Sequence, residues 1–162
     1  MNYDEWKKTI PLAIKADSLW KMAAYRLATL AGDLAWHDVT KLAQDHRTLR
    51  LSDQLYGAVG SIGANLAEGY SMGTGKNRAR YYEYALGSAR EGRDWYNKGR
   101  HVLSHVVVEH RMGLLAEIIE LLLTMVPQQR QSVIREENAS YETGEVSSWN
   151  GMDILLQNIP LP

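Results

Sequence analysis

Apolar residues recur at spacings of three and four along most of this chain, and this pattern constrains its fold more than any other feature. Such spacing places side chains on one face of an α-helix. The alternation of apolar and polar residues that a half-buried strand requires is missing. The sequence therefore predicts an all-α protein, and four long helices with short connections are typical of an antiparallel up-down four-helix bundle.

The length and composition fit one such bundle with a segment at each end. The chain has 162 residues, of which 45% are hydrophobic and 23% are charged, as in an ordinary soluble domain. We expect an N-terminal arm over residues 1–16, the bundle over 17–127, and a mobile polar tail with a short apolar end over 128–162. The apolar end, residues 149–162, either docks on the bundle or a partner or has no fixed structure.

Several classes of protein are excluded at this stage. The chain has no cysteine, which excludes a disulfide scaffold, a thiolate metal site and a cysteine nucleophile. No uncharged apolar stretch is long enough to span a membrane. The first residues carry acidic groups before a lysine pair and lack an apolar core, unlike a signal peptide. We therefore expect a cytoplasmic protein without a membrane partner.

The ends of the four predicted helices follow from proline, glycine and polar connectors. The predicted helices cover residues 17–44, 52–68, 76–104 and 108–126. We expect Pro127 to end the last helix, because proline lacks the N–H that continues the hydrogen-bond pattern. We expect Gly69 to take the left-handed conformation just past the end of the second helix.

The second predicted helix has two uncharged sides, because no charged residue lies between Asp53 and Glu68. The side that we expect in the core carries Leu55, Val59, Ile62 and Leu66. The other side carries the small residues Gly57, Gly60, Ala64 and Ala67. Each glycine inside a helix costs up to ~1 kcal/mol relative to alanine, so close approach of a second helix is needed as compensation. We predict that this small-residue side is an oligomer or close-packing face, covered by another element or a neighbouring subunit.

Polar residues near the end of the second helix and on the third predict a structural contact between the two helices. The residues of this predicted polar lock are Asn65, Glu68, Arg80, Ser88 and Glu91. A buried carboxylate needs a charged or hydrogen-bonding partner, which Arg80 would supply to Glu68. A catalytic carboxylate is the alternative, but no base or metal ligand is in view beside it, and we assign no catalytic residue.

Basic residues are concentrated in one segment. Residues 76–112 carry eight basic groups against four acidic ones, whereas residues 113–162 carry two against seven. A segregated basic segment is typical of a face that binds nucleic acid or an acidic partner. The residues that we assign to this face are Arg78, Arg90, Arg93, Lys98 and Arg100. The alternative is a solvated helix whose counter-charges lie elsewhere.

A metal site is the third hypothesis that the sequence raises. His101, His105 and Glu109 are spaced by four residues, and their side chains could ligate a divalent cation from one helix face. Such a site also needs ligands on a facing helix, and the chain contains no Glu-x-x-His pair. We therefore favour a solvent-facing polar stripe, and predict no metal and no cofactor.

One segment of the second helix carries a family resemblance. Residues 61–69 read Ser-Ile-Gly-Ala-Asn-Leu-Ala-Glu-Gly, which resembles the Ser-Ile-Pro-Ser/Ala-Asn-Ile-Ala-Glu-Gly signature of the proteins encoded within 23S ribosomal RNA intervening sequences. Residues 51–55 and 80–91 are similar to further motifs of that family in the same order. Gly63 departs from the pattern, because it stands where the family usually has proline.

The resemblance implies a four-helix bundle that assembles into ring-shaped homo-oligomers, often pentamers, mostly without an assigned reaction. A related group consists of accessory proteins of diversity-generating retroelements, which bind a reverse transcriptase and nucleic acid through a basic surface. We therefore expect a non-enzymatic oligomeric accessory protein that binds RNA, DNA or a reverse transcriptase. The alternatives are a protein–protein scaffold that binds no nucleic acid and a metal-dependent enzyme.

Overall fold

The computed structural model describes residues 1–131 and 149–162, and these residues form helices and connecting turns without any strand. The all-α prediction is confirmed. The predicted mobile polar tail falls largely on residues 132–148, which lie outside the described residues. The helices are α1 (Tyr3–Thr9), α2 (Leu12–Lys15), α3 (Ala23–Leu42), α4 (Leu49–Tyr70), α5 (Gly75–Gly99), α6 (His105–Gln131) and α7 (Trp149–Gln157).

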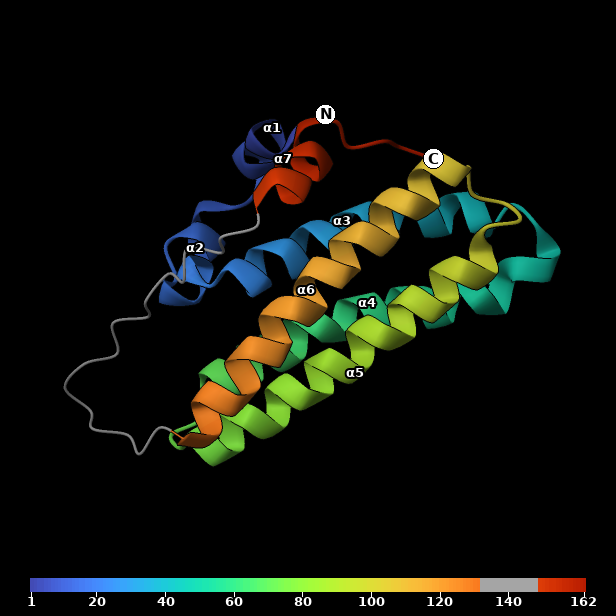
Figure 1. Ribbon diagram of the computed structural model, residues 1–162. Coiled ribbons are helices and arrows are strands. Elements are labelled where there is room, and N and C mark those ends of the chain that lie inside the picture. The colour runs from blue at the N-terminus through green and yellow to red at the C-terminus, as the bar shows by residue number, and fades with distance from the viewer. Residues whose placement is uncertain (132–148) are drawn as a thin grey trace.

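Four long helices, α3 to α6, make up the body of the molecule (Figure 1). Helix α4 packs on α3, α5 packs on α4, and α6 packs on both α5 and α3. The four helices match the four predicted ones, except that the first prediction began too early. The chain there forms a short 3-10 helix, Ser18–Lys21, before α3 starts at Ala23.

The core lies where the apolar stripes of the four long helices meet. The predicted α4 stripe of Leu55, Val59, Ile62 and Leu66 is completely buried. The inward line of α5 consists mostly of small residues, and Gly92 is one of them. A Cβ atom built at Gly92 would lie 3.2 Å from Val59 Cγ2 on α4 and 3.6 Å from Leu115 Cδ1 on α6. The absence of a side chain there lets α5 approach both neighbours closely.

Gly69 is part of α4 and does not adopt a left-handed conformation, so that prediction is wrong. The residue is buried, and a Cβ atom built on it would lie 2.7 Å from Tyr82 Cε1 on α5 and 3.0 Å from the Cβ atom of Tyr81. Real Cβ contacts are not that short. Glycine is therefore required at this position by the close approach of the two helices rather than by its backbone conformation.

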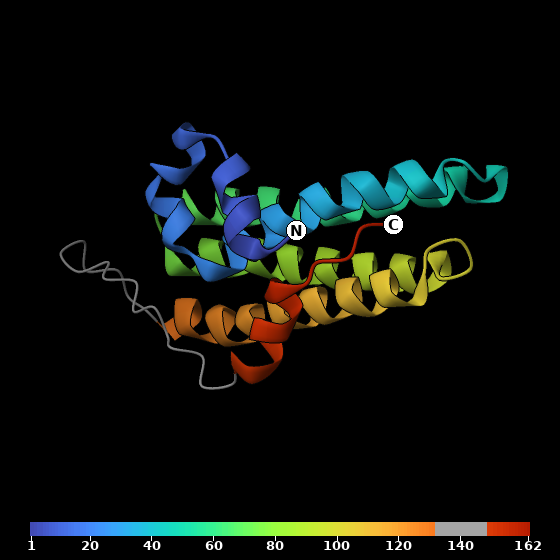
Figure 2. The same ribbon diagram turned by 90° about the horizontal axis from the view of Figure 1, so that it is seen from above.

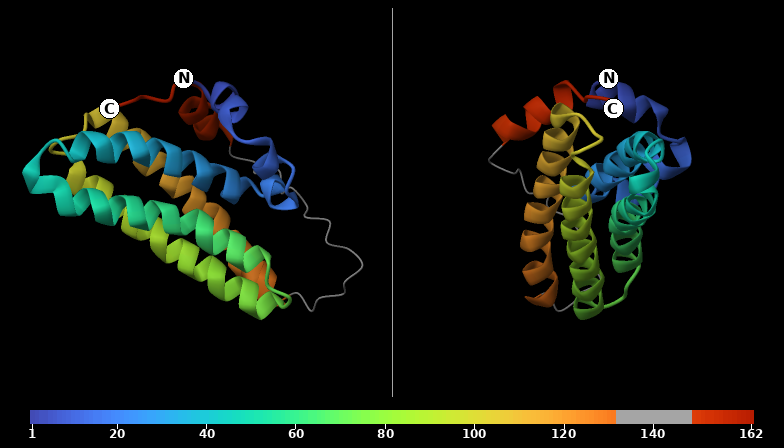
Figure 3. Two further views of the ribbon diagram at one scale, coloured as in Figure 1. Left: turned by 180° about the vertical axis from the view of Figure 1, so that it is seen from behind. Right: turned by 90° about the vertical axis from the view of Figure 1, so that its right-hand side faces the viewer.

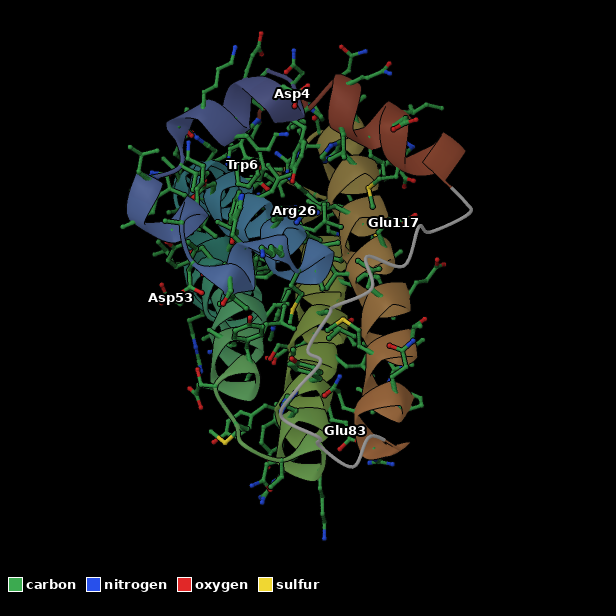
Figure 4. All side chains as sticks on the ribbon, turned by 90° about the vertical axis from the view of Figure 1, so that its left-hand side faces the viewer. Asp4, Trp6, Arg26, Asp53, Glu83 and Glu117 are labelled. Carbon is green, nitrogen blue, oxygen red and sulfur yellow. The ribbon has the colours of Figure 1, made fainter. Side chains whose placement is uncertain are left out.

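The N-terminal arm is folded onto the rest of the molecule through α1. Helix α1 starts with a capping box in which Asn2 and Glu5 bond to each other's main-chain N–H groups. Trp6 is 2% exposed and its indole N–H donates to Asp33 Oδ2 on α3 at 2.7 Å. Figure 4 shows Trp6 beneath α1, on the side of that helix that faces the bundle.

Pro127 lies inside α6 and does not end it, contrary to the prediction. The helix continues to Gln131, one turn beyond the proline. Proline removes a single main-chain hydrogen bond, and Pro127 is exposed close to the end of the helix, where this loss is least costly. On the adjacent α5, Glu83 forms an ion pair with Arg130 near the end of the bundle shown in Figure 4.

The C-terminal segment, residues 149–162, docks on the bundle. Figure 2 shows α7 and the following residues lying over the side of the molecule where α3 and α6 face each other. The Ile159 N–H donates to the Met1 carbonyl at 3.1 Å, so the C-terminal segment passes the N-terminus on this side, as Figure 3 shows. Among the described residues, no helix is both long and apolar enough to cross a membrane.

Candidate functional site

Part of the predicted basic face forms one exposed stripe along α5 and its C-cap residue, Arg100. Arg90, Arg93 and Arg100 are exposed, and their spacings of three and seven residues place them on one side of the helix. Within residues 1–131 and 149–162, Arg90 and Arg93 make no ion pair and no side-chain hydrogen bond. Arg100 donates to the main-chain and side-chain oxygens of Asn97. We call Arg90, Arg93 and Arg100 the basic stripe.

The other two residues of the predicted basic face are engaged within the chain. Arg78 is half-buried, and it donates to the Met72 carbonyl at 3.0 Å and to Gln129 Oε1 on α6 at 3.4 Å. Lys98 forms an ion pair with Asp94, one turn earlier on α5. Arg78 therefore holds the α4–α5 connection in place, and the charge of Lys98 is partly neutralised.

The predicted polar lock between α4 and α5 does not form. Asn65 donates to a carbonyl of its own helix, and Arg80 and Glu91 bond to side chains one turn later on α5. Glu68 and Arg80 are both exposed, so the Glu68 carboxylate is not buried and does not need a partner. Ser88 is half-buried, and its side chain makes no hydrogen bond to any residue that the structure describes.

The predicted oligomer or close-packing face of α4 is open in the single chain. Gly57, Gly60 and Ala64 are exposed and Ala67 is half-buried. No atom lies within 4 Å of a Cβ atom built at Gly57 or Gly60. The prediction that another element of the same chain covers this face is therefore wrong. A neighbouring subunit as its cover stays a prediction.

An exposed aromatic pair borders this open face. Trp36 on α3 is 59% exposed and Tyr56 on α4 is 44% exposed. Their ring centroids are 6.0 Å apart at an interplanar angle of 63°, an edge-to-face arrangement that favours aromatic pairs. Large exposed aromatic side chains beside an uncharged helix face are typical of a protein-binding surface.

The three predicted metal ligands do not share a helix face. His101 lies in the turn after α5, whereas His105 and Glu109 lie in the first turns of α6. His105 Nδ1 and Glu109 Oε1 are 3.8 Å apart and both side chains are exposed. No group of three His, Asp or Glu side chains that could hold a metal ion occurs in residues 1–131 and 149–162.

A buried cluster of polar side chains was missed by the sequence analysis. The Asp38 carboxylate on α3 accepts hydrogen bonds from Arg111 Nε at 2.7 Å and Nη2 at 3.1 Å. It also accepts from the Tyr96 hydroxyl on α5 at 2.7 Å. Asp38 is 0% exposed, and Arg111 and Tyr96 are each 1% exposed. One carboxylate thus joins α3, α5 and α6 inside the bundle.

The outer side of this cluster contacts the C-terminal segment. Arg111 Nη2 donates to the Pro160 carbonyl at 2.8 Å. Arg111 Nη1 and His110 Nδ1 are 2.9 Å apart, and His110 Nε2 lies 2.8 Å from the Leu155 carbonyl. An arginine only donates, so His110 Nδ1 is the acceptor and His110 Nε2 carries the hydrogen that is donated to Leu155.

Burial controls the protonation of the cluster. Burial, and then the charge and hydrogen bond of Asp38, raise the pKa of Tyr96 well above its usual value, so its hydroxyl remains a donor. Burial is also the main reason that the pKa of His110 is lowered below 6.5, which keeps the imidazole neutral. The cluster therefore presents fixed N–H donors to main-chain carbonyls and offers no free nucleophile or base.

A signal for the cluster was present in the sequence. Asp38 continues the apolar stripe of α3 at four-residue steps between Leu34 and Leu42, and Arg111 lies four residues after the buried Val107 on α6. A charged residue within an apolar stripe indicates a buried ion pair, because an isolated buried charge is costly. The sequence cannot show that the two residues pair with each other.

One comparison with known proteins matches most of the four long helices. The sequence model of the family described as 23S rRNA-intervening sequence protein matches residues 21–125. No curated protein and no solved structure matches the chain. The matched residues include the whole of α3, α4 and α5 and most of α6, which confirms the resemblance seen in residues 61–69. The chain therefore belongs to the 23S rRNA-intervening sequence protein family.

Proposed function

We propose that the protein is a cytoplasmic, non-enzymatic and oligomeric accessory protein that binds nucleic acid, or an enzyme of nucleic-acid metabolism such as a reverse transcriptase, through the basic stripe. In this proposal α3 to α6 form an antiparallel up-down four-helix bundle that displays the stripe. The supporting observation is that Arg90 and Arg93 are exposed and make no ion pair within the described residues.

The physical basis of the proposal is counterion release. A basic side chain that neutralises a phosphate releases a condensed counterion, and the affinity then falls as salt rises. Three contacts to a single strand correspond to a slope of log affinity against log salt of about −2. Unpaired arginines contribute most, because they do not have to leave an acidic partner first.

The experiment measures binding of a fluorescent single-stranded RNA by anisotropy at ~50 and ~200 mM salt, a range over which phosphate contacts weaken strongly. The triple variant Arg90→Glu, Arg93→Glu and Arg100→Glu should lose most of the affinity and of the salt slope while its circular dichroism stays unchanged. The control variant carries the same change of charge at the exposed Lys8, Lys21 and Lys41.

Two results would count against nucleic-acid binding. The first is the absence of RNA binding by the unmodified protein at ~50 mM salt, where such contacts are strongest. The second is an equal loss of affinity in the stripe variant and in the control variant, since this would show only an effect of net charge. Single-stranded DNA of the same sequence distinguishes RNA from nucleic acid in general.

A second candidate function is a homo-oligomeric scaffold that does not bind nucleic acid. The open face of Gly57, Gly60 and Ala64, with the exposed Trp36 and Tyr56 beside it, favours contact between copies of this chain. A ring, in the form of the pentamer implied by the family resemblance, would bury this face. Sedimentation should then give a mass that is a multiple of 18.3 kDa. Ala64→Arg should reduce this mass. The control Gly87→Arg, at an exposed position of α5, should leave it unchanged.

A further inference from the structure

The C-terminal segment, residues 149–162, fits its docking place on the bundle through two apolar side chains. Met152 is 6% exposed and Ile159 is 4% exposed, and both belong to the same cluster of buried residues as the bundle core. These two residues are the anchors of the segment. In contrast, Ile154 is 72% exposed and Leu161 is 53% exposed, so only one side of the segment is used for docking.

Main-chain groups of the segment are recognised by fixed donors of α6. Arg111 is held by two hydrogen bonds to Asp38, so its remaining Nη2 hydrogen points in a set direction, toward the Pro160 carbonyl. His110 Nε2 binds the Leu155 carbonyl. Hydrogen bonds to main-chain carbonyls recognise the backbone of a bound peptide, whereas the apolar contacts select its side chains.

The surface of α6 is shaped to receive the segment. A Cβ atom built at Gly113 would lie 3.1 and 3.2 Å from the two Cδ atoms of Leu155, which is tighter than most real contacts. Glycine inside a long helix costs stability relative to alanine. The contact with Leu155 explains why residue 113 is a glycine, because any side chain there would occupy the space of Leu155.

We propose that Arg111, His110 and Gly113, with Asp38 behind them, form a peptide-binding site whose resident ligand is residues 149–162 of the same chain, and that the segment binds there reversibly without depending on its covalent connection. We call this surface the tail site. Its ligand is a peptide that forms a short helix, Trp149–Gln157, with an irregular end after it, and that carries apolar side chains seven residues apart with free main-chain carbonyls beside them. The proposal is independent of the basic stripe, which lies on α5.

The test separates the segment from the bundle after the full chain has folded. A protease recognition sequence replaces residues 138–143 in the full-length protein, which is purified and then cut. Native mass spectrometry should detect the freed fragment still bound at micromolar concentration. A fluorescent synthetic peptide of residues 149–162 should replace the resident fragment. The rise in the anisotropy of the synthetic peptide as cut protein is added measures this replacement.

Three variants make the result specific. Ile159→Ser in the synthetic peptide, and separately Gly113→Leu in the bundle, should each weaken binding at least tenfold. Gly87→Leu is the matched control, because Gly87 is also a helical glycine, lies on α5 and has no atom within 4 Å of its Cβ position. It should leave binding unchanged.

The proposal is overturned if the cut fragment dissociates at once from a bundle that remains folded. It is equally overturned if the peptide with Ile159→Ser binds as well as the original. That second measurement alters only the ligand, so it decides the matter even if Gly113→Leu impairs folding of the bundle.

Discussion

Asp38 accepts three hydrogen bonds in a part of the molecule that water does not reach, two from Arg111 and one from Tyr96. Its charge balances that of the buried Arg111 beside it. A balanced buried pair adds little net stability over an apolar pair of the same shape, but removing one partner leaves the other uncompensated. The cluster therefore stabilises the fold only while both charged partners are present.

Asp38→Asn should lower the free energy of unfolding by about 3–5 kcal/mol, because it leaves the Arg111 charge buried without a counter-charge. Urea titration followed by circular dichroism measures the change. Asp94→Asn, which breaks the exposed pair with Lys98, serves as the control and should change it by at most ~1 kcal/mol. A loss in Asp38→Asn no larger than in the control would contradict the buried pair.

His110 should make stability depend on pH below neutrality. The groups facing it are Arg111 on its own helix, Asp38 on α3 and the Leu155 carbonyl of the tail. Because burial lowers its pKa in the folded protein, the unfolded chain binds a proton first as pH falls below 6.5. The free energy of unfolding should therefore decrease from pH 6.5 downward and level off below the folded pKa.

The measurement is the urea midpoint between pH 7.5 and 5, compared between the unmodified protein and His110→Gln. The difference between the two proteins should shrink as pH falls. The same pH dependence in both proteins would show that His110 is not the titrating group.

Single residues show where sequence reasoning succeeds and where it stops. The burial of Leu55, Val59 and Ile62 follows from their spacing alone, because any packed helix buries its apolar stripe. The pairing of Asp38 with Arg111 joins residues 73 positions apart, and no local pattern specifies which buried charge meets which. The polar lock failed for a related reason, since nothing local shows that Glu68 and Arg80 both face solvent.

At the scale of helices, the two sides of α4 differ sharply in burial. One side is completely buried in the core, and the other, with Gly57, Gly60 and Ala64, is exposed. Gly69 at its end is the glycine that close packing requires, because Tyr82 occupies the space of a side chain. Close packing within the chain thus explains Gly69, whereas Gly57 and Gly60 lie on an open face and need a different explanation.

Alanine substitutions separate these two reasons. Gly57→Ala and Gly60→Ala should each raise the free energy of unfolding, measured by urea titration, by up to ~1 kcal/mol, because alanine has the higher helix propensity and no atom occupies the space. Gly69→Ala should lower it, because overpacking a filled site costs about 1–3 kcal/mol. If a neighbouring subunit covers the face, Gly57→Ala and Gly60→Ala should also reduce the assembled mass. Equal effects of all three substitutions would contradict this account of α4.

The helices at the two ends were the hardest to predict. Helix α1 has only seven residues, too short to be stable in isolation, and it is held by the burial of Trp6 and its bond to Asp33. Helix α7 is similarly short and depends on contacts with α6. Short elements of this kind are specified by the surface that they cover, and so their own residues do not reveal them.

At the scale of the whole molecule, the tail and the open face of α4 lie on different sides. Helix α7 covers the region where α3 and α6 meet, whereas α4 lies away from it in both views of Figure 3. The basic stripe on α5 is a third separate surface. The three proposed binding surfaces, for a polyanion, for the tail and for a second copy, therefore lie apart, and the proposals predict no competition among them.

Deletion of residues 149–162 tests this separation. The shortened protein should keep the same number of subunits as the full chain, measured by sedimentation, and the same affinity for RNA. Its free energy of unfolding should fall, because the apolar surface under Met152 and Ile159 becomes exposed and Arg111 loses a partner. A change in the number of subunits would show that the tail takes part in assembly.

The hydrogen bond from Ile159 to the Met1 carbonyl has a practical consequence for protein engineering. Neighbouring chain ends are a geometry that circular permutation tolerates. A short linker from Pro162 to Met1 would close the backbone, and new ends could be opened at the exposed Gly73 between α4 and α5. In that rearranged gene product the segment of residues 149–162 would be internal and tethered from both directions.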